Sequence, residues 1–218
     1  MRLFCVDTDR SSGRRPRMKK PAFLFVLALA ALAFAPVVAA PQGGPALTPF
    51  EVGKTVPGDI ALTDLDGKVH KLADYRGKVV FIHFWSIVCP YEKLAEPKCK
   101  ELQSSYSDKG VVQIAVNANQ GELKEGPPYD KLREHVQQAG VNFIVTVDPG
   151  NKVTDVLGGQ TTPHCFVIDK NGVLQYQGAL DDDPKGTKGA AATPYVKNAI
   201  DAVLAGQPAP VTTSKPYG

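Results

Sequence analysis

The feature that most constrains the fold is a seven-residue run, Val-Val-Phe-Ile-His-Phe-Trp at positions 79–85. Apolar side chains occupy both sets of alternating positions, so a strand formed by these residues must be covered on both of its faces. Strands of this kind are typical of the centre of an α/β sheet, with helices packed on either side. The run therefore predicts a layered α/β domain with itself as the central strand.

The rest of the chain supplies the other elements of such a domain. Two short strands around Asp64-Leu65-Asp66-Gly67 predict an N-terminal β-hairpin extension, and Lys170-Asn171-Gly172 predicts a second hairpin near the end. We expect one mixed sheet with helices on both faces and no second domain. The strands are expected at 60–63, 68–71, 79–85, 111–116, 141–147, 164–169 and 173–177, and the helices at 90–109, 129–138, 151–157 and 195–205. In the first helix Leu94, Cys99, Leu102 and Tyr106 have the spacing of an inward face.

Residues 1–39 have the order of a cleavable signal peptide. A basic stretch ending in Lys19-Lys20 precedes an apolar run over 21–35, and small residues follow up to Ala39, where we expect cleavage. A start at Met18 would give a shorter signal of the same form. The alternative is an uncleaved anchor, because about 20 apolar residues can span a bilayer. We expect a periplasmic or secreted protein that contacts a membrane only if the leader is retained.

Beyond the leader, the chain divides into three further parts. Residues 40–57 are rich in Pro and Gly and predict a lead-in linker. Residues 58–206 hold the predicted domain. Residues 207–218 form a polar, Pro-containing tail, which we expect to be mobile or to lie along the surface.

The charges argue against nucleic acid as a partner. The whole chain carries 25 Lys and Arg against 22 Asp and Glu, but seven of the basic side chains lie in the leader, leaving 18 basic and 20 acidic ones after residue 40. A nucleic-acid-binding domain needs its basic side chains clustered on the folded part. The folded part here is slightly acidic.

Cys89 stands where the central strand ends and the first predicted helix begins. At this place a sulfur faces the unpaired backbone N–H groups of the first helical turn and the positive end of the helix dipole. Both features favour the thiolate over the thiol. The carboxyl end of a central strand is also where open α/β sheets place their sites. The alternative is an inert buried Cys.

The spacing of several motifs resembles that of the thioredoxin-like superfamily. Trp85, Cys89, Pro90 and Pro97 are similar to its active-site strand and helix, and Thr162-Pro163 is similar to its cis-proline turn. The segment from Val88 to Glu92 resembles the reactive Cys segment of peroxiredoxins. Three further motifs belong to the same pattern: Val116-Asn117-Ala118-Asn119, Gly178-Ala179-Leu180-Asp181-Asp182 and Leu204-Ala205-Gly206-Gln207-Pro208. Together, all of these motifs resemble the peroxiredoxin-like branch of the AhpC/TSA redoxins over residues 50–218. The resemblance implies a thioredoxin-like fold and thiol oxidation–reduction at Cys89.

The sequence departs from both parent patterns. Glu92 stands where a Cys-x-x-Cys reductase has its second Cys, so a rapid intramolecular disulfide exchange is not available at this motif. Peroxiredoxins have Pro and Thr or Ser seven and three residues before the Cys, and an Arg that polarises the peroxide. Ser86 fits the hydroxyl position, but Ile82 stands where the Pro is expected. After residue 40 the only arginines are Arg76 and Arg133, and neither lies near residue 165, where the resemblance would place the peroxide-polarising Arg.

Two histidines are candidates for a role beside Cys89. His83 occupies the position of the buried acid of thioredoxins, where it would act as a proton carrier near neutral pH; the alternative is a core His with one hydrogen bond. By the resemblance, His164 follows the cis-proline and lies near Cys89. Cys89, His83 and His164 then form a conceivable copper site. Because the superfamily's copper chaperones supply two Cys, we expect no metal and no cofactor.

The two remaining cysteines pose a question of geometry. Cys99 lies ten residues along the helix from Cys89, about 15 Å at 1.5 Å per residue, which is too far for a disulfide while the helix is intact. The resemblance places Cys99 near the strand that carries Cys165, and we hypothesise a structural disulfide between them. The alternative is two unpaired core thiols.

We therefore expect an exported redoxin in which Cys89 reduces a peroxide or exchanges with a protein disulfide, and an external thiol, small or from a thioredoxin-like protein, restores it. His83 is the candidate second catalytic residue. The alternatives are a redox-silent binding module that holds peptides in a thioredoxin-like groove, and a copper-handling protein. The expected substrate pocket consists of Trp85, Ser86, Pro90, Glu92, Thr162, Pro163 and His164.

Overall fold

The computed structural model describes residues 49–218, so the predicted leader lies outside the described residues. Within this range a seven-stranded sheet has the order β2-β1-β5-β4-β3-β6-β7. The predicted central strand, β3, pairs in parallel with β4 and antiparallel with β6. The strands are β1 (Ala61–Asp64), β2 (Val69–Lys71), β3 (Val79–Trp85), β4 (Val111–Asn117), β5 (Ile144–Val147), β6 (Cys165–Ile168) and β7 (Leu174–Gly178). The mixed sheet is confirmed.

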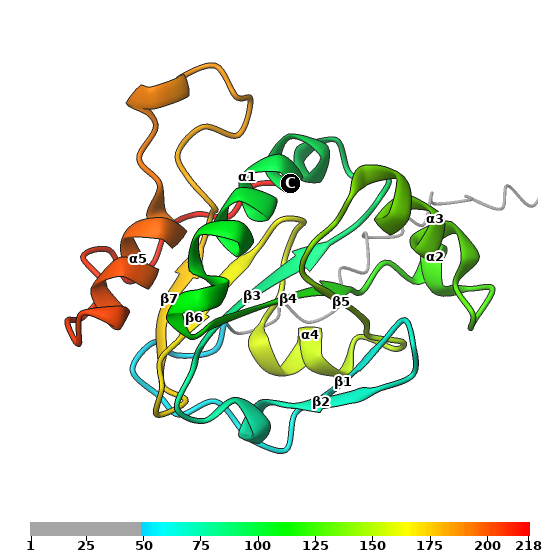
Figure 1. Ribbon diagram of the computed structural model, residues 1–218, viewed down its shortest axis with the longest axis horizontal. Coiled ribbons are helices and arrows are strands. Elements are labelled where there is room, and N and C mark those ends of the chain that lie inside the picture. Colours follow the sequence, from blue (N-terminus) through cyan, green and yellow to red (C-terminus); the bar gives the residue numbers. More distant parts are fainter. Residues whose placement is uncertain (1–48) are drawn as a thin grey trace, which may run out of the picture. The chain divides into compact units, whose positions relative to one another are not determined.

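Helices cover both faces of this sheet, as the two-sided apolar character of β3 requires. Odd-numbered residues of β3, such as Phe81, pack in one core cluster with residues of α1, α3 and α5, while even-numbered residues, such as Ile82, pack with α4 and the segment before β1. In Figure 1 α1 lies above the central strands and α4 below them. The helices are α1 (Pro90–Tyr106), α2 (Gln120–Leu123), α3 (Asp130–Ala139), α4 (Lys152–Leu157) and α5 (Tyr195–Leu204), with 3-10 turns at Leu72–Tyr75, Ser107–Lys109 and Gly189–Ala191.

The structure differs from the expected elements in a few places. Between the strand expected at 111–116 and the helix expected at 129–138 lies the short helix α2, whose N-cap Asn119 accepts a hydrogen bond from the backbone N–H of Gly121. β5 begins at Ile144 rather than at 141. Leu94, expected to face inward, is 47% exposed, whereas Cys99 and Tyr106 are buried. Among residues 49–218, no helix is both long and apolar enough to cross a membrane.

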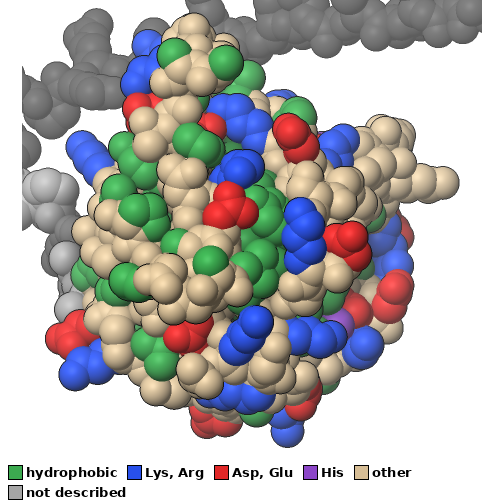
Figure 2. Space-filling view, turned by 60° about the vertical axis from the view of Figure 1, so that its left-hand side comes forward, with side chains coloured by type: hydrophobic (Ala, Val, Ile, Leu, Met, Phe, Trp, Pro, Cys, Tyr) green, Lys and Arg blue, Asp and Glu red, His purple; other side chains and the backbone are tan. Residues whose placement is uncertain are grey.

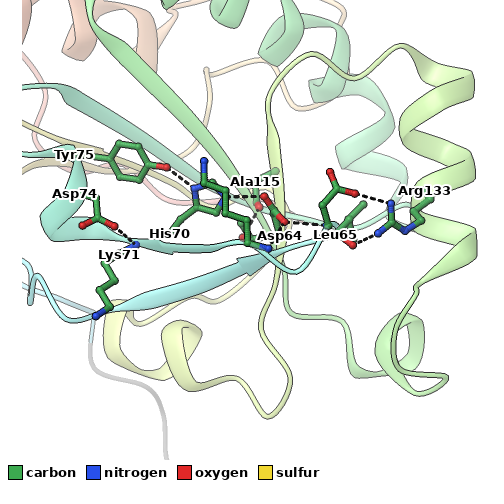
Figure 3. A network of polar contacts seen from close by, with 11 residues as sticks. Asp64, Leu65, His70, Lys71, Asp74, Tyr75, Ala115 and Arg133 are labelled. Atoms are coloured by element: carbon green, nitrogen blue, oxygen red, sulfur yellow. Dashed lines mark hydrogen bonds and ion pairs between the residues drawn. The ribbon is translucent and has the colours of Figure 1, made fainter.

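The N-terminal β-hairpin extension is confirmed, and polar contacts fix its ends. The His70 ring lies between Tyr75 and Asp64, with Nδ1 2.5 Å from the tyrosine oxygen and Nε2 2.8 Å from Asp64 Oδ2 (Figure 3). Arg133 of α3 reaches the hairpin turn, where it pairs with Asp66 at 2.9 Å and donates to the carbonyl of Leu65. Arg133 thereby joins the hairpin to α3, and the antiparallel pairing of β1 with β5 joins it to the rest of the sheet.

Candidate active site around Cys89

Cys89 is the N-cap residue of α1, and Pro90 takes the first helical position. Proline suits that position because its missing N–H would have no partner there. The thiol is half-buried, between the buried end of β3 and the exposed residues Val88 and Pro90. It therefore lies at the positive end of the helix dipole and within reach of solvent.

The turn before β6 lies directly against this sulfur. The Thr162-Pro163 peptide bond is cis, as the resemblance implied. The Cys89 thiol donates a hydrogen bond to the carbonyl oxygen of Thr162 at a distance of 2.9 Å. Because β6 pairs with β3, the sheet itself brings residues 162 and 89 together although 73 positions separate them.

Glu122, which is not among the residues predicted for the site, organises the loop before Cys89. Glu122 of α2 accepts hydrogen bonds from Ser86 Oγ at 2.5 Å and from the backbone N–H groups of Ile87 and Val88 at 3.2 and 3.3 Å. It also accepts from Asn117 Nδ2 at 2.6 Å and Asn119 Nδ2 at 3.1 Å. In the sequence, only the polar residues Asn117 and Asn119 at the end of a predicted strand indicated this part of the site, because α/β sheets place their sites at the carboxyl ends of strands.

His83 and Glu92 meet beneath Cys89 in the core. Both side chains are almost fully buried, and Nε2 of His83 lies 3.7 Å from Oε1 of Glu92. Burial lowers the pKa of His83 to about 3, so its ring stays neutral near neutral pH. Burial, together with the nearby Glu96 and Cys89 charges, raises the pKa of Glu92 well above its usual value. The role of His83 as a proton carrier stays a prediction, and burial disfavours the charged ring that would form when it takes up a proton.

The structure does not assemble the conceived copper site. Among the described His, Cys, Asp and Glu side chains, His83 groups with Glu92 and Cys99, whose ligand atoms all lie within 4.8 Å of one another. Cys89 and His164 are not part of this group. The His164 ring packs on Phe166, with ring centroids 4.4 Å apart, and accepts from the backbone N–H of Gln160. Burial lowers the pKa of His164 to about 4.

Most of the residues expected to line a substrate pocket lie under the surface instead. Trp85 is fully buried, and its indole N–H donates to Glu96 Oε2, which also lies 2.8 Å from His135 Nε2. Ser86, Glu92, Pro163 and His164 are buried as well, whereas Pro90 is exposed and Thr162 half-buried. The buried residues support the shape of the site, and Cys89, Pro90 and Thr162 form its accessible part.

Cys99 and Cys165 are free thiols, both fully buried, and the disulfide hypothesised between them is not formed in this structure. Burial is the main cause that raises the pKa of each thiol well above its usual value, which keeps both sulfurs protonated and unreactive. Among the described residues, Cys89 is thus the accessible thiol.

The C-terminal segment lies along the surface beside the cis-proline turn, one of the two arrangements expected for it. Thr161 Oγ1 donates to the carbonyl of Tyr217 at 3.2 Å, and the Tyr217 hydroxyl donates to Asp181 Oδ1 at 3.0 Å. The rings of Tyr217 and Tyr91 have centroids 6.0 Å apart. The segment therefore borders the accessible part of the site.

A separate hollow of about 380 Å³ lies between α1, α5 and the segment that precedes α5. Figure 2 shows the side of the molecule on which hydrophobic side chains are exposed between Lys or Arg and Asp or Glu side chains. The residues that line the hollow include Lys98, Leu102, Tyr106, Leu180, Pro194 and Lys197. Cys89 is not one of them, so the hollow is separate from the candidate site.

Comparisons with known proteins agree with the fold. The family model described as Redoxin matches residues 51–195. The Thiol-disulfide oxidoreductase ResA of Geobacillus thermodenitrificans (strain NG80-2) is 36% identical over 128 residues, 59% of this chain and 69% of the relative. The ResA of Bacillus anthracis is 36% identical over 129 residues, with the same two shares.

Solved structures give the same result. An uncharacterized conserved protein from Geobacillus kaustophilus matches with a TM-score of 0.65 and 27% identity, over 78% of this chain and 95% of that one. A proposed thiol:disulfide interchange protein DsbE from Chlorobium tepidum matches with a TM-score of 0.50 and 29% identity, over 58% and 84%. With its thioredoxin-like sheet, its cis-proline turn and the matching family model, the chain belongs to the Redoxin family.

Proposed function

We propose that this redoxin is a thiol-disulfide oxidoreductase in which Cys89 is the single nucleophile. The observation that carries the proposal is the position of its sulfur, at the N-terminus of α1 and 2.9 Å from the Thr162 carbonyl oxygen. An extended substrate can lie along this turn and present a disulfide to Cys89. The names of the ResA relatives support the same reaction class.

The reaction begins when the Cys89 thiolate attacks one sulfur of the substrate disulfide. That S–S bond breaks, its other sulfur leaves as a thiolate that takes a proton from solvent, and a mixed disulfide forms between Cys89 and the substrate. A first external thiol then attacks Cys89 Sγ and releases the second substrate thiol. A second external thiol restores Cys89 and leaves as an external disulfide.

The external thiols are needed because α1 offers no second thiol near its N-terminus. Glu92 occupies the position three residues after Cys89, and Cys99 is buried roughly three turns further along the helix. The protein should therefore accumulate the mixed disulfide when no reductant is present.

Disulfides fit this site better than peroxides. The described residues include two arginines, and both lie elsewhere: Arg76 donates to the carbonyl of Val56, and Arg133 pairs with Asp66 at the hairpin turn. Neither supplies the guanidinium that polarises a peroxide in peroxiredoxins. Peroxide reduction is therefore the second candidate, supported by the hydroxyl of Ser86 alone.

The leader motif supports export as part of the proposal. A basic stretch, an apolar run and small residues precede Pro41 in the order that a signal peptidase reads. Expression in a bacterial host should give a protein that begins near Ala40 and is released by osmotic shock. Recovery of the uncleaved chain in the membrane fraction would support the anchor instead.

Trapping of the mixed disulfide tests the reaction. The reduced protein is mixed with an excess of a disulfide-containing peptide, quenched with acid and mapped by mass spectrometry. We expect the peptide adduct on Cys89, none on Cys99 or Cys165, and none on residue 89 in Cys89→Ser. A parallel sample with hydrogen peroxide and dimedone measures sulfenic acid at the same residue, which we expect to form more slowly.

Three outcomes would contradict the proposal. An adduct on Cys99 or Cys165 would show that the buried thiols react. Faster labelling by peroxide than by the disulfide would make peroxide the substrate. Absence of both products at Cys89, with binding of the peptide retained in Cys89→Ser, would identify a redox-silent binding module.

A further inference from the structure

Three side chains that can bind a metal meet in the core between β3 and α1. His83 comes from the central strand, whereas Glu92 and Cys99 come from the inner face of the helix. One ligand atom from each lies within 4.8 Å of the others, and all three residues are almost completely buried. The burial of Glu92 is unusual, because charged side chains are seldom fully buried without a partner.

The group has unmet bonding capacity. Both ring nitrogens of His83 and both carboxylate oxygens of Glu92 are buried without a hydrogen-bond partner. Buried polar atoms without partners are strongly unfavourable and call for a specific explanation, such as a bound ion. A direct hydrogen bond between His83 and Glu92, now 3.7 Å apart, would satisfy one atom of each and leave two without partners.

We propose that His83, Glu92 and Cys99 bind a Zn²⁺ ion between β3 and α1. One imidazole nitrogen, one thiolate sulfur and a carboxylate that binds through both oxygens supply four donor atoms, the number that Zn²⁺ takes in structural sites. Mg²⁺ and Ca²⁺ are excluded by the donor set, because these ions take oxygen ligands. Cu⁺ prefers sulfur and nitrogen and would leave the carboxylate unused.

Charge balance supports this ion. A thiolate at Cys99 and a carboxylate at Glu92 carry two negative charges, His83 binds as the neutral ring, and Zn²⁺ brings the total to zero. A neutral site inside the core avoids the cost of a buried net charge.

The site is distinct from the reactive thiol. Cys89 caps the same helix but is not among the three ligands. The ion would tie the first turns of α1 to the central strand and so fix the helix that carries Cys89. The inference does not depend on the substrate of Cys89, and its test needs no activity assay.

Cobalt substitution tests the site directly. The full chain carrying Cys5→Ser and Cys89→Ser, which retains only Cys99 and Cys165 as thiols, is refolded with and without Co²⁺ and then titrated with Zn²⁺. We expect one equivalent of Co²⁺, a thiolate-to-cobalt absorption band, and displacement of the cobalt by Zn²⁺. Zinc should also raise the unfolding temperature of this variant.

Further variants in the same background identify the ligands. Cys99→Ala and Glu92→Gln should each weaken Co²⁺ binding by at least about 100-fold, because loss of a residue that only hydrogen-bonds to a metal ligand already costs up to about 100-fold in affinity. Cys99→Ala should also lose the thiolate-to-cobalt band. Cys165→Ala is the matched control, because Cys165 is equally buried but outside the group, and it should retain the band. Circular dichroism checks that each variant folds. Absence of one bound equivalent, or a thiolate band that persists in Cys99→Ala, would overturn the assignment.

Discussion

At the scale of single residues, one carboxylate, Glu122, determines the shape of the loop that leads to Cys89. It accepts hydrogen bonds from two backbone N–H groups and from the side chains of Ser86, Asn117 and Asn119. Because every partner is a donor, the site requires an acceptor on both oxygens. A glutamine side chain, which has an acceptor oxygen on one side and a donor NH2 group on the other, cannot replace Glu122.

We therefore expect Glu122→Gln to destabilise the fold by about 1–3 kcal/mol, the range for leaving buried donors unsatisfied. Urea denaturation would measure the loss, and alkylation of Cys89 would report whether the loop has moved. Glu125→Gln is the control, since Glu125 is exposed and pairs only with Lys131 among the described residues; its stability should be unchanged. Equal stabilities of the two variants would refute the role of Glu122.

The residue three positions after Cys89 determines whether the protein can form its own disulfide. Glu92→Cys creates a Cys-x-x-Cys motif in the first turn of α1. We expect the oxidised variant to contain a disulfide between Cys89 and the introduced thiol and to reduce insulin with dithiothreitol faster than the natural protein, because the second thiol resolves the mixed disulfide intramolecularly. Glu92→Ser removes the same carboxyl without adding a thiol and should show no gain. Free thiols at both positions after oxidation would contradict this view of the motif.

At the scale of elements, the β1–β2 hairpin depends on a polar chain of Asp64, His70 and Tyr75 (Figure 3). Partial burial acts to raise the pKa of Asp64, but hydrogen bonds from His70 and from the backbone of Lys68 and Asp66 prevail and lower it. A carboxyl whose pKa is lowered by folding contributes stability above its unfolded pKa. The contribution is lost as the pH falls through the folded pKa.

Asp64→Asn should therefore destabilise the protein by about 1 kcal/mol near neutral pH, the usual worth of a partly exposed hydrogen bond. The difference from the natural protein should narrow as the pH falls below the carboxyl's ordinary pKa of 3.8, where Asp64 itself becomes protonated. Thermal unfolding of both proteins at a series of pH values measures this. A difference that stays constant down to the lowest pH would show that the charge of Asp64 is irrelevant.

At the scale of the whole molecule, residues far apart in sequence border the accessible thiol of Cys89. The end of β3, the start of α1, the cis-proline turn and the C-terminal segment meet there because β6 lies beside β3 and the segment returns along β7 through a bridge from Thr213 to Gln177. Tyr217 then contacts Thr161 and Asp181. Access to Cys89 is thus shaped by a part of the chain that carries no catalytic motif.

Removal of the Tyr217 ring should make the Cys89 thiol more accessible to solvent. We expect Tyr217→Ala to increase the rate of Cys89 alkylation severalfold, because the ring packs near Tyr91 and holds the segment through Asp181. Lys215→Ala, an exposed neighbour in the same segment, is the matched control and should react like the natural protein. An unchanged rate in Tyr217→Ala would show that the segment does not limit access.

The sequence alone determined the order of the strands and of the helices other than α2, the interior place of β3 in the sheet and the position of Cys89 at the start of α1. Those features follow from local patterns, namely two-sided apolar runs, helical spacing and turn residues. Only the tertiary structure decided that His83 is neutral, that Trp85 and His164 are buried, and that Glu122 supports the loop. Burial and hydrogen-bond partners come from segments that are distant in sequence, so no local pattern contains them. The same reason explains why three ordinary residues on β3 and α1 became visible as a candidate metal site only in the folded protein.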